Sequence, residues 1–222
     1  MTKQLHKLGY TCSRSRVARL MAKNRIYAKT KRKFKVTTDS NHNYPVSSDL
    51  LEQHFTVDAP NKIWVSDITY IRTMAGWLYL TIVLDLFNRQ IVGWSISHRL
   101  TAITTTIPAI VDAFHRQHPT ADLIFHSDRG VQYACHDFRT KLAEYHMIQS
   151  MSGKGNCYAN AVAESFFHTL KTELVYFETY YTREQAKLSI FEYIEVFYNR
   201  ERLHSTLGDK TPVEFANLNN AA

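Results

Sequence analysis

The rest of the chain is organised around the run CYANAVAESFFHTLKTELV, residues 157–175. This run has a helical pattern and contains one acidic residue near its middle, Glu164. Its alanines and leucines favour a helix. At about 100° per residue, His168 lies roughly 40° from Glu164, Lys171 lies roughly 20° to the other side, and Asn160 lies one turn earlier. A separate face carries apolar side chains, which are Val162, Phe166, Leu170 and Leu174. We therefore predict a helix with a polar face centred on Glu164.

Two strand-like runs upstream of this helix each contain an aspartate. In IWVSDITYI, residues 63–71, Asp67 interrupts β-branched and aromatic residues, where an unpaired carboxylate is disfavoured. In LIFHSDRG, residues 123–130, an apolar run ends at Asp128 and a glycine turn. If the fold brings both aspartates to Glu164, the three like charges need a cation, and oxygen ligands alone suit Mg²⁺ or Mn²⁺ rather than zinc. Taken singly, Asp67 could instead pair with Arg72, and Asp128 could cap its own turn.

The spacing of the three acidic residues resembles a known arrangement. Asp67, Asp128 and Glu164, with 35 residues between the last two, look like the DDE triad of retroviral integrases and bacterial insertion-sequence transposases. Further motifs agree in order and spacing from about Phe55 to Phe215. They resemble the OrfB transposase of the IS-three family, and they are WVSDITYI (64–71), LDLFNRQIVGW (84–94), HSDRGVQY (126–133), SGKGNCYANAVAESFFHTLKTEL (152–174) and YNRERLHSTLGDKTPVEF (198–215).

That resemblance implies an RNase H-like α/β fold, with a mixed five-stranded sheet in the order βββαβαβαα and helices on both faces. It also implies nicking of DNA at the ends of an insertion sequence and joining of the 3′-OH to a second strand. Asp67, Asp128 and Glu164 would hold two Mg²⁺ (or Mn²⁺) ions, with Asp67 bridging both. Two alternatives stay open. One is an N-terminally truncated, inactive DNA-binding relic of a transposase, and the other is a plain RNase H-like nuclease that hydrolyses without joining.

The order of strand and helix patterns independently indicates the same fold. Residues 63–71, 77–86 and 90–97 read as strands, and their short connections predict an antiparallel meander. The remaining pattern predicts a helix, a strand, a helix, a strand and two helices, at residues 102–115, 123–125, 133–145, 148–151, 157–175 and 183–198. Such a mixed sheet has helices on both faces.

Positive charge is concentrated at the N-terminus, where residues 1–40 contain 12 of the 27 Lys and Arg residues and one acid, Asp39. We predict a basic helical DNA-binding arm (1–36), a linker (37–54) and an integrase catalytic core (55–219). The arm resembles part of a helix-turn-helix segment whose opening helices are expected before Met1. Its helix at residues 13–23 and its basic run at 29–35 are expected to bind DNA phosphates through Arg14, Arg16, Arg19, Lys31, Arg32 and Lys33. The alternative is a solvated basic linker.

Three residues near Glu164 are further candidates for DNA binding. Lys154 and Asn156 belong to the GKGN loop, where glycine permits a close approach of the backbone to a phosphate. The family resemblance places Lys171 on DNA beside the metals. For each, the alternative is an ordinary connector or a solvated helix charge.

Four other residues have structural interpretations. We interpret Asp85, at the end of a strand, as a turn residue, and His126 as a core histidine. Arg200 and Arg202 could contact DNA or interact with a helix C-terminus, and the sequence does not choose between these.

Composition bounds location and partners. Cys12, Cys135 and Cys157 form neither a CxxC pair nor a Cys/His cluster, which fits a reducing cytoplasm and disfavours a zinc finger. No signal peptide and no 18-residue apolar run is present. We expect a soluble bacterial cytoplasmic protein that associates with the nucleoid when bound to DNA. Its expected partners are element-end and target DNA, further copies of itself on DNA and an upstream helix-turn-helix protein of the same element, but no membrane.

Overall fold

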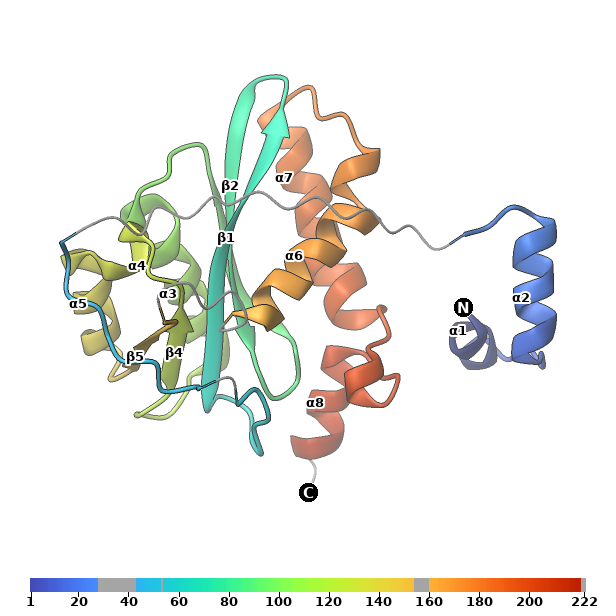
Figure 1. The fold of residues 1–222 in the computed structure, drawn as a ribbon, viewed down its shortest axis with the longest axis horizontal. Coiled ribbons are helices and arrows are strands. Elements are labelled where there is room, and N and C mark those ends of the chain that lie inside the picture. The colour runs from blue at the N-terminus through green and yellow to red at the C-terminus, as the bar shows by residue number, and fades with distance from the viewer. Residues whose placement is uncertain (28–42, 53, 154–159, 221–222) are drawn as a thin grey trace.

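The computed structural model describes residues 1–27, 43–52, 54–153 and 160–220, and a five-stranded sheet lies at its centre (Figure 1). The strand order is β3-β2-β1-β4-β5. The strands are β1 (Ile63–Thr73), β2 (Gly76–Asp85), β3 (Ile91–Ser97), β4 (Ile124–Ser127) and β5 (Ile148–Met151). The first three form the predicted antiparallel meander, whereas β4 runs parallel to β1 and β5 runs parallel to β4.

Helices cover both faces of this sheet, as predicted, and Figure 1 shows the two groups on either side of β1. One group is α3 (Thr106–Gln117), α4 (Val131–Ala134) and α5 (His136–Glu144), and the other is α6 (Ala161–Glu173) and α7 (Arg183–Phe191). Each group packs its own buried cluster against the sheet. Because side chains alternate along a strand, the adjacent residues Trp64 and Val65 belong to opposite clusters. The mixed sheet between two helical layers is an RNase H-like arrangement.

Close packing of α3 on β3 depends on a glycine. A Cβ atom at Gly93 would lie 2.5 Å from both the Ala109 carbonyl oxygen and the Ala113 nitrogen. Glycine inside a strand often marks such a backbone approach. This contact fixes the layer that supports the β2–β3 side of the sheet.

The C-terminal part of the chain follows α7 in short pieces. Residues Glu192–Tyr198 continue α7 as a π-helix, a 3-10 turn occupies Ser205–Leu207, and α8 spans Pro212–Asn220. Further 3-10 turns lie at Ala102–Thr104, before α3, and at Val175–Phe177, after α6. Within the described residues, no helix is long and apolar enough to cross a membrane.

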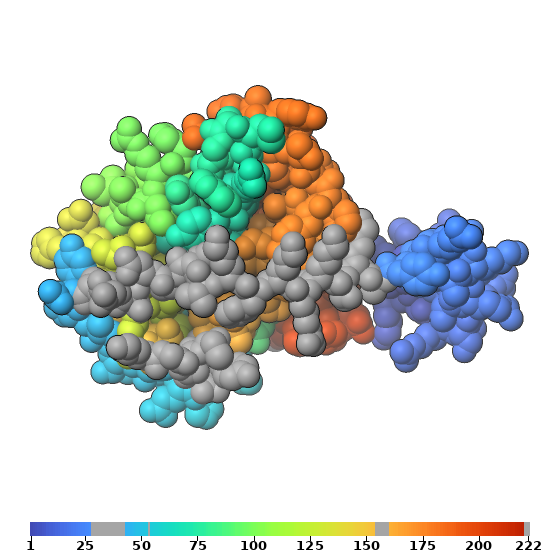
Figure 2. All heavy atoms as spheres, turned by 45° about the horizontal axis from the view of Figure 1, so that its top comes forward, coloured from blue at the N-terminus to red at the C-terminus, as the bar shows by residue number. Residues whose placement is uncertain are grey.

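The N-terminal arm contains two helices, α1 (Thr2–Lys7) and α2 (Arg14–Lys23). Ser13 caps α2, because its hydroxyl accepts from the Arg16 nitrogen at 3.2 Å. Figure 2 shows this arm at one end of the molecule. Two ion pairs join α1 to the C-terminal region, Lys3 with Asp209 at 3.1 Å and Lys7 with Glu214.

Three predicted helices differ from the observed ones. The helix predicted at 133–145 divides into α4 and α5, since Cys135 has extended backbone angles. The helix predicted from 102 begins as α3 only at Thr106, because the Thr105 hydroxyl bonds the Thr101 carbonyl at 2.6 Å and Thr105 leaves the helical region. The helix predicted at 157–175 is α6, which ends at Glu173, and residues 157–159 lie outside the described part of the chain.

Part of the predicted linker lies on the core. The Ser48 carbonyl accepts from the Met151 nitrogen at 3.2 Å, and the Leu50 nitrogen donates to the Ser150 hydroxyl at 2.9 Å. Leu51 is buried in the cluster beneath α6 and α7. These contacts cover the outer edge of β5, and the largely polar sequence before Leu50 does not predict them.

Candidate active site

Asp67 lies in the middle of β1, the central strand, opposite Ile82 of β2. Its Oδ1 atom accepts from the Ile68 nitrogen at 2.7 Å. The side chain is partly exposed, while its neighbour Ser66 is fully buried. The strand therefore presents one carboxylate from an otherwise uncharged and largely buried stretch, residues 63–71.

Asp128 follows directly after β4, the parallel neighbour of β1. Its Oδ1 atom accepts from the Gly130 nitrogen at 2.9 Å, so the residue does cap the SDRG turn. The next side chain, Arg129, donates from Nε to the Ser152 carbonyl at 2.6 Å and ties the turn to the segment after β5. Capping orients Asp128 and does not remove it from the neighbourhood of Asp67.

The charges of the acidic residues act on one another. The pKa of Asp67 is raised well above its ordinary value, first by burial, then by the negative charge of Asp128 and less by that of Glu164. The Ile68 hydrogen bond and the positive charge of Lys171 oppose this rise. A carboxylate in this position favours its neutral form unless a cation is supplied.

Glu164 and Lys171 come from α6, which packs against β1. Glu164 lies in the first turn and is exposed, and partial burial raises the pKa of its carboxyl. Lys171 lies near the end of the helix, where burial lowers the pKa of its ammonium and the charge of Asp67 raises it. Within the described part of the chain Lys171 forms no ion pair, consistent with the predicted separation of two helical turns from Glu164.

The three carboxylates of Asp67, Asp128 and Glu164 are suitable ligands for a hard divalent cation, although the structure does not arrange them as a closed metal site. They supply only oxygen ligands, and the raised pKa of Asp67 marks the place where positive charge is needed. Among the described residues, no group of three or more His, Cys, Asp and Glu side chains is arranged to hold a metal ion. Of the triad, Asp128 perturbs Asp67 more strongly than the exposed Glu164 does.

Sequence patterns missed two polar residues beside these acids. The Ser66 hydroxyl and the Tyr133 hydroxyl of α4 are hydrogen-bonded at 2.8 Å, and both side chains are buried. Burial, followed by the charges of Asp67 and Asp128, raises the pKa of Tyr133 well above its ordinary value. Their only sequence signal is position, because each lies within five residues of an aspartate of the triad.

Three of the other candidate residues have structural partners. Asp85 is fully buried and accepts from the Asn61 and Phe87 nitrogens, both at 2.8 Å, which confirms it as a turn residue. His126 is buried and its Nδ1 atom lies 2.9 Å from the Ser150 hydroxyl, as expected of a core histidine. Arg200 donates from Nε to the Glu195 carbonyl at 3.1 Å, which is a contact with a helical carbonyl.

Arg202 joins the end of α6 to the C-terminal segment. Its Nη2 and Nε atoms lie 2.9 Å and 3.1 Å from Glu173 Oε1, and Nε lies 3.0 Å from Oε2. The Tyr193 hydroxyl donates to the same carboxylate at 2.8 Å. This arrangement supports the structural interpretation of Arg202 over a contact with DNA.

The residues predicted to bind DNA are described only in part. Arg14, Arg16 and Arg19 are exposed on α2 and form no ion pair among the described residues. Five predicted residues lie outside the described residues, and they are Lys31, Arg32, Lys33, Lys154 and Asn156.

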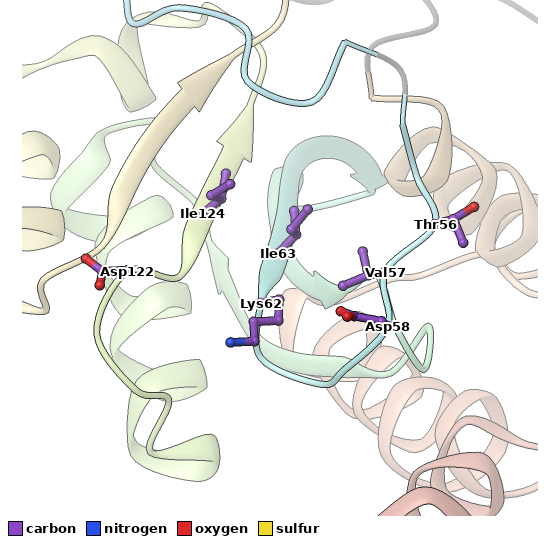
Figure 3. A pocket seen from close by; sticks show the side chains of 7 residues that line it. All are labelled: Thr56, Val57, Asp58, Lys62, Ile63, Asp122 and Ile124. Carbon is purple, nitrogen blue, oxygen red and sulfur yellow. The ribbon is translucent and has the colours of Figure 1, made fainter.

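An open cavity of about 440 Å³ is lined by other residues than Asp67, Asp128 and Glu164. Figure 3 shows Ile63 and Ile124 on neighbouring strands of this cavity, with Val57 and Asp58 on the segment that leads into β1. Ile63 and Ile124 begin β1 and β4, whereas Asp67 and Asp128 lie further along or beyond these strands. The cavity is therefore separate from Asp67 and Asp128.

Comparison with protein families finds two integrase core domain matches, at residues 57–157 and 164–219, and an HTH-like domain match at residues 1–34. The transposase InsF for insertion sequence IS3A of Escherichia coli (strain K12) is 42% identical over 219 residues, which cover 99% of this chain and 76% of that protein. The insertion element IS600 uncharacterized 31 kDa protein of Shigella sonnei is 45% identical over 212 residues, which cover 96% of this chain and 78% of that protein.

Solved structures with the same fold come from retroviruses. The simian T-cell lymphotropic virus intasome in complex with PP2A regulatory subunit B56 gamma matches with a TM-score of 0.61 and 16% identity, covering 81% of this chain and 60% of that one. The HTLV-2 integrase catalytic core domain in complex with magnesium, in its trimeric form, matches with a TM-score of 0.52 and 18% identity, covering 71% of this chain and 97% of that one.

Proposed function

Since this chain belongs to the IS3 family of insertion-sequence transposases, which are DDE polynucleotidyl transferases, we propose that Asp67, Asp128 and Glu164 are its catalytic residues. The reaction is nicking and joining of DNA strands during transposition of an insertion sequence. The observation that carries the assignment is the placement of the acids: Asp67 lies on β1, Asp128 follows β4, which pairs with β1, and Glu164 lies on α6, which packs against β1. The charges of both Asp128 and Glu164 raise the pKa of Asp67. Three residues far apart in the sequence thus act on one point.

The carboxylates would hold divalent metal, and we propose two Mg²⁺ (or Mn²⁺) ions. Metal bound there would activate the attacking oxygen and stabilise the departing 3′ oxygen. Asp67 is the central ligand in this proposal because the charges of the other two both raise its pKa. Its position on the central strand, held by pairing with β2 on one side and β4 on the other, gives the site a rigid base.

The exposed Glu164 completes the set from α6. Its helix packs against β1, and its exposed side chain would move inward to share metal with Asp67. The uncompensated repulsion between the carboxylates opposes this approach until positive charge is present. We therefore propose that the triad assembles fully only on binding metal.

Positive side chains would bind the DNA. Lys171 lies within electrostatic reach of Asp67, which suits a contact with a phosphate next to the scissile group. In the arm, the exposed Arg14, Arg16 and Arg19 of α2 would bind phosphates, together with the basic residues at 31–33. Lys154 and Asn156 stay candidates for the same role. We also propose that the active form is a homo-oligomer on element-end and target DNA.

The test is metal-dependent joining of a pre-nicked element end to a target plasmid. Asp67→Asn, Asp128→Asn and Glu164→Gln should each abolish cleavage and joining and weaken Mn²⁺ binding while the protein stays folded. Asp85→Asn is the control variant. The Asp85 carboxylate lies outside the proposed site, and its two oxygens accept hydrogen bonds from backbone N–H groups. Any triad variant that retains wild-type joining would remove that residue from the proposed site.

The same assay separates the rival functions. A plain nuclease would cleave the DNA in a metal-dependent manner but give no joined product. A relic that only binds DNA would give neither product, although it would retain salt-dependent affinity for DNA. Membership of the transposase family favours joined products.

A further inference from the structure

Asn160 connects the two elements that carry Asp67 and Glu164. It directly precedes α6 and is only 5% exposed. Its Nδ2 atom donates to the Ser66 carbonyl, at 3.0 Å, one residue before Asp67 on β1. Its own carbonyl accepts from the Glu164 nitrogen at 3.1 Å. One buried residue therefore contacts both chain segments immediately beside the proposed metal ligands.

The side chain of Asn160 does not do what such a residue usually does at a helix start. There, a side-chain oxygen commonly accepts from an N–H group of the first turn. Thr182 does so at the start of α7, where its hydroxyl accepts from the Gln185 nitrogen at 3.1 Å. Asn160 makes no such capping bond, because its amide is turned towards β1. The contact between helix and strand replaces the cap.

Only one of the two polar atoms in the Asn160 amide has a hydrogen-bond partner among the described residues. Its Oδ1 atom is buried and has no hydrogen-bond partner among the described residues. Asn199 offers a comparison, because it is equally buried but bonds the Ile91 nitrogen and carbonyl, both at 3.0 Å, through its two amide atoms. A buried acceptor without a partner lowers stability. Stability alone therefore explains an amide at position 160 poorly. Buried polar atoms without a hydrogen-bond partner are rare and are typical of functional sites.

A second hydrogen bond extends this connection to the third acidic segment. The Ser66 hydroxyl is bonded to the Tyr133 hydroxyl at 2.8 Å, and Tyr133 belongs to α4, the helix that follows the Asp128 turn. Asn160, Ser66 and Tyr133 are all buried. We infer that Asn160 is a positioning residue, which holds the first turn of α6 against β1 and thereby sets how far Glu164 lies from Asp67.

This inference rests on the proposed metal site, because the distance between the two carboxylates has a consequence only if they share metal. Residues that orient metal ligands typically change metal affinity by about 10-fold to 100-fold when replaced. Asn160 would act in this way through Glu164 without touching the metal or the DNA.

The experiment measures Mn²⁺ binding by electron paramagnetic resonance for the full chain and for Asn160→Ser. Serine is as good a helix cap as asparagine but is too short to bridge to the Ser66 carbonyl, so it removes the bridge and keeps the helix start. The matched control is Asn199→Ser, which removes a buried asparagine bridge between a helix and β3, away from the carboxylates. Asn160→Thr, with another capping residue, repeats the test if the serine variant does not fold.

We expect Asn160→Ser to fold and to bind Mn²⁺ about 10-fold or more weakly, with cleavage restored by added Mn²⁺. Asn199→Ser should lower the melting temperature but leave Mn²⁺ affinity unchanged. Wild-type Mn²⁺ affinity in Asn160→Ser would overturn the positioning role, as would failure of both position-160 variants to fold while Asn199→Ser folds. If the wild-type chain itself binds no Mn²⁺, the proposed metal site is wrong, which is a distinct result.

Discussion

Replacing Asp67 with asparagine should stabilise the metal-free protein while abolishing its reaction. The pKa of Asp67 in the folded chain is raised by burial and by the charges of Asp128 and Glu164. The folded state therefore holds a proton on this carboxyl more tightly than the unfolded state does. Its contribution to stability is fully present below the unfolded-state pKa of about 3.9 and is lost as the pH rises through the folded-state pKa. Asparagine mimics the neutral form at every pH.

The size of the effect follows from the shift itself. Each unit by which the folded-state pKa exceeds the unfolded-state pKa corresponds to about 1.4 kcal/mol of unfolding free energy lost at neutral pH. In a chain of this length, 1 kcal/mol moves the melting temperature by about 2–4 °C. Asp67→Asn should therefore melt above wild type at pH 8 in EDTA, by about 3–6 °C for each such unit, and the difference should shrink towards pH 4.

Metal should reverse this order. A ligand that binds only the folded state at 100 times its dissociation constant stabilises by about 2.7 kcal/mol. Mn²⁺ at that level should raise the melting temperature of wild type and leave Asp67→Asn unchanged. Melting followed by circular dichroism, in EDTA and in Mn²⁺ at several pH values, measures both effects on the same preparations.

Asp85→Asn is the matched control for this prediction. Both Asp85 oxygens accept backbone N–H groups, from Asn61 and Phe87, and an amide nitrogen cannot accept either bond. Burial also raises the pKa of Asp85, which favours asparagine, but loss of one such bond to a buried group costs about 1–3 kcal/mol, so this variant should melt below Asp67→Asn at neutral pH. The reasoning about Asp67 would be refuted if Asp67→Asn were less stable than wild type at pH 8 in EDTA.

Three other outcomes are expected. Lys171→Ala should leave Mn²⁺ affinity nearly intact but reduce binding and joining of element-end DNA. Lys171→Arg should restore part of the DNA binding and joining because it keeps the charge. Joining by Lys171→Ala at the wild-type level would show that the lysine is an ordinary helix charge. Arg202→Ala should lower the unfolding free energy by about 1–2 kcal/mol, since it removes the partly exposed bidentate pair with Glu173. It should not change the salt dependence of DNA affinity, and a changed salt slope would instead place Arg202 on DNA. Deleting residues 1–40 should reduce the log–log salt slope of DNA affinity by about 0.9 for each phosphate that the arm neutralises, and an unchanged slope would show that the arm does not bind phosphate.

The sheet was predictable because local rules determine most of it. Short turns connect β1, β2 and β3, so their antiparallel pairing follows from the sequence alone. The apolar run of β4 and the helix of Glu164 were recognisable from side-chain pattern. The resemblance to integrases supplied what local rules cannot, namely that strands β1 and β4 lie side by side and bring Asp67 near Asp128.

The parts that were missed depend on contacts between distant residues. The break at Cys135 follows no proline or glycine, and Leu51 is buried whereas the adjacent Leu50 is exposed. Arg202 and Glu173 are 29 residues apart and meet only after α6 and the C-terminal segment have packed. Patterns within a short window contain no information about such pairs.

Asn160 shows the same limit inside the site. The helical wheel placed it on the side of Glu164, and from that position it reads as one more polar surface residue. The fold instead buries it at the helix start, where its amide meets a backbone carbonyl of β1. Every residue has a backbone carbonyl, so the sequence does not indicate which carbonyl the Asn160 amide contacts. The proposed triad was therefore suggested by the acids and by the family resemblance, whereas the residue that we infer sets their separation could be found only once the strand lay beside the helix.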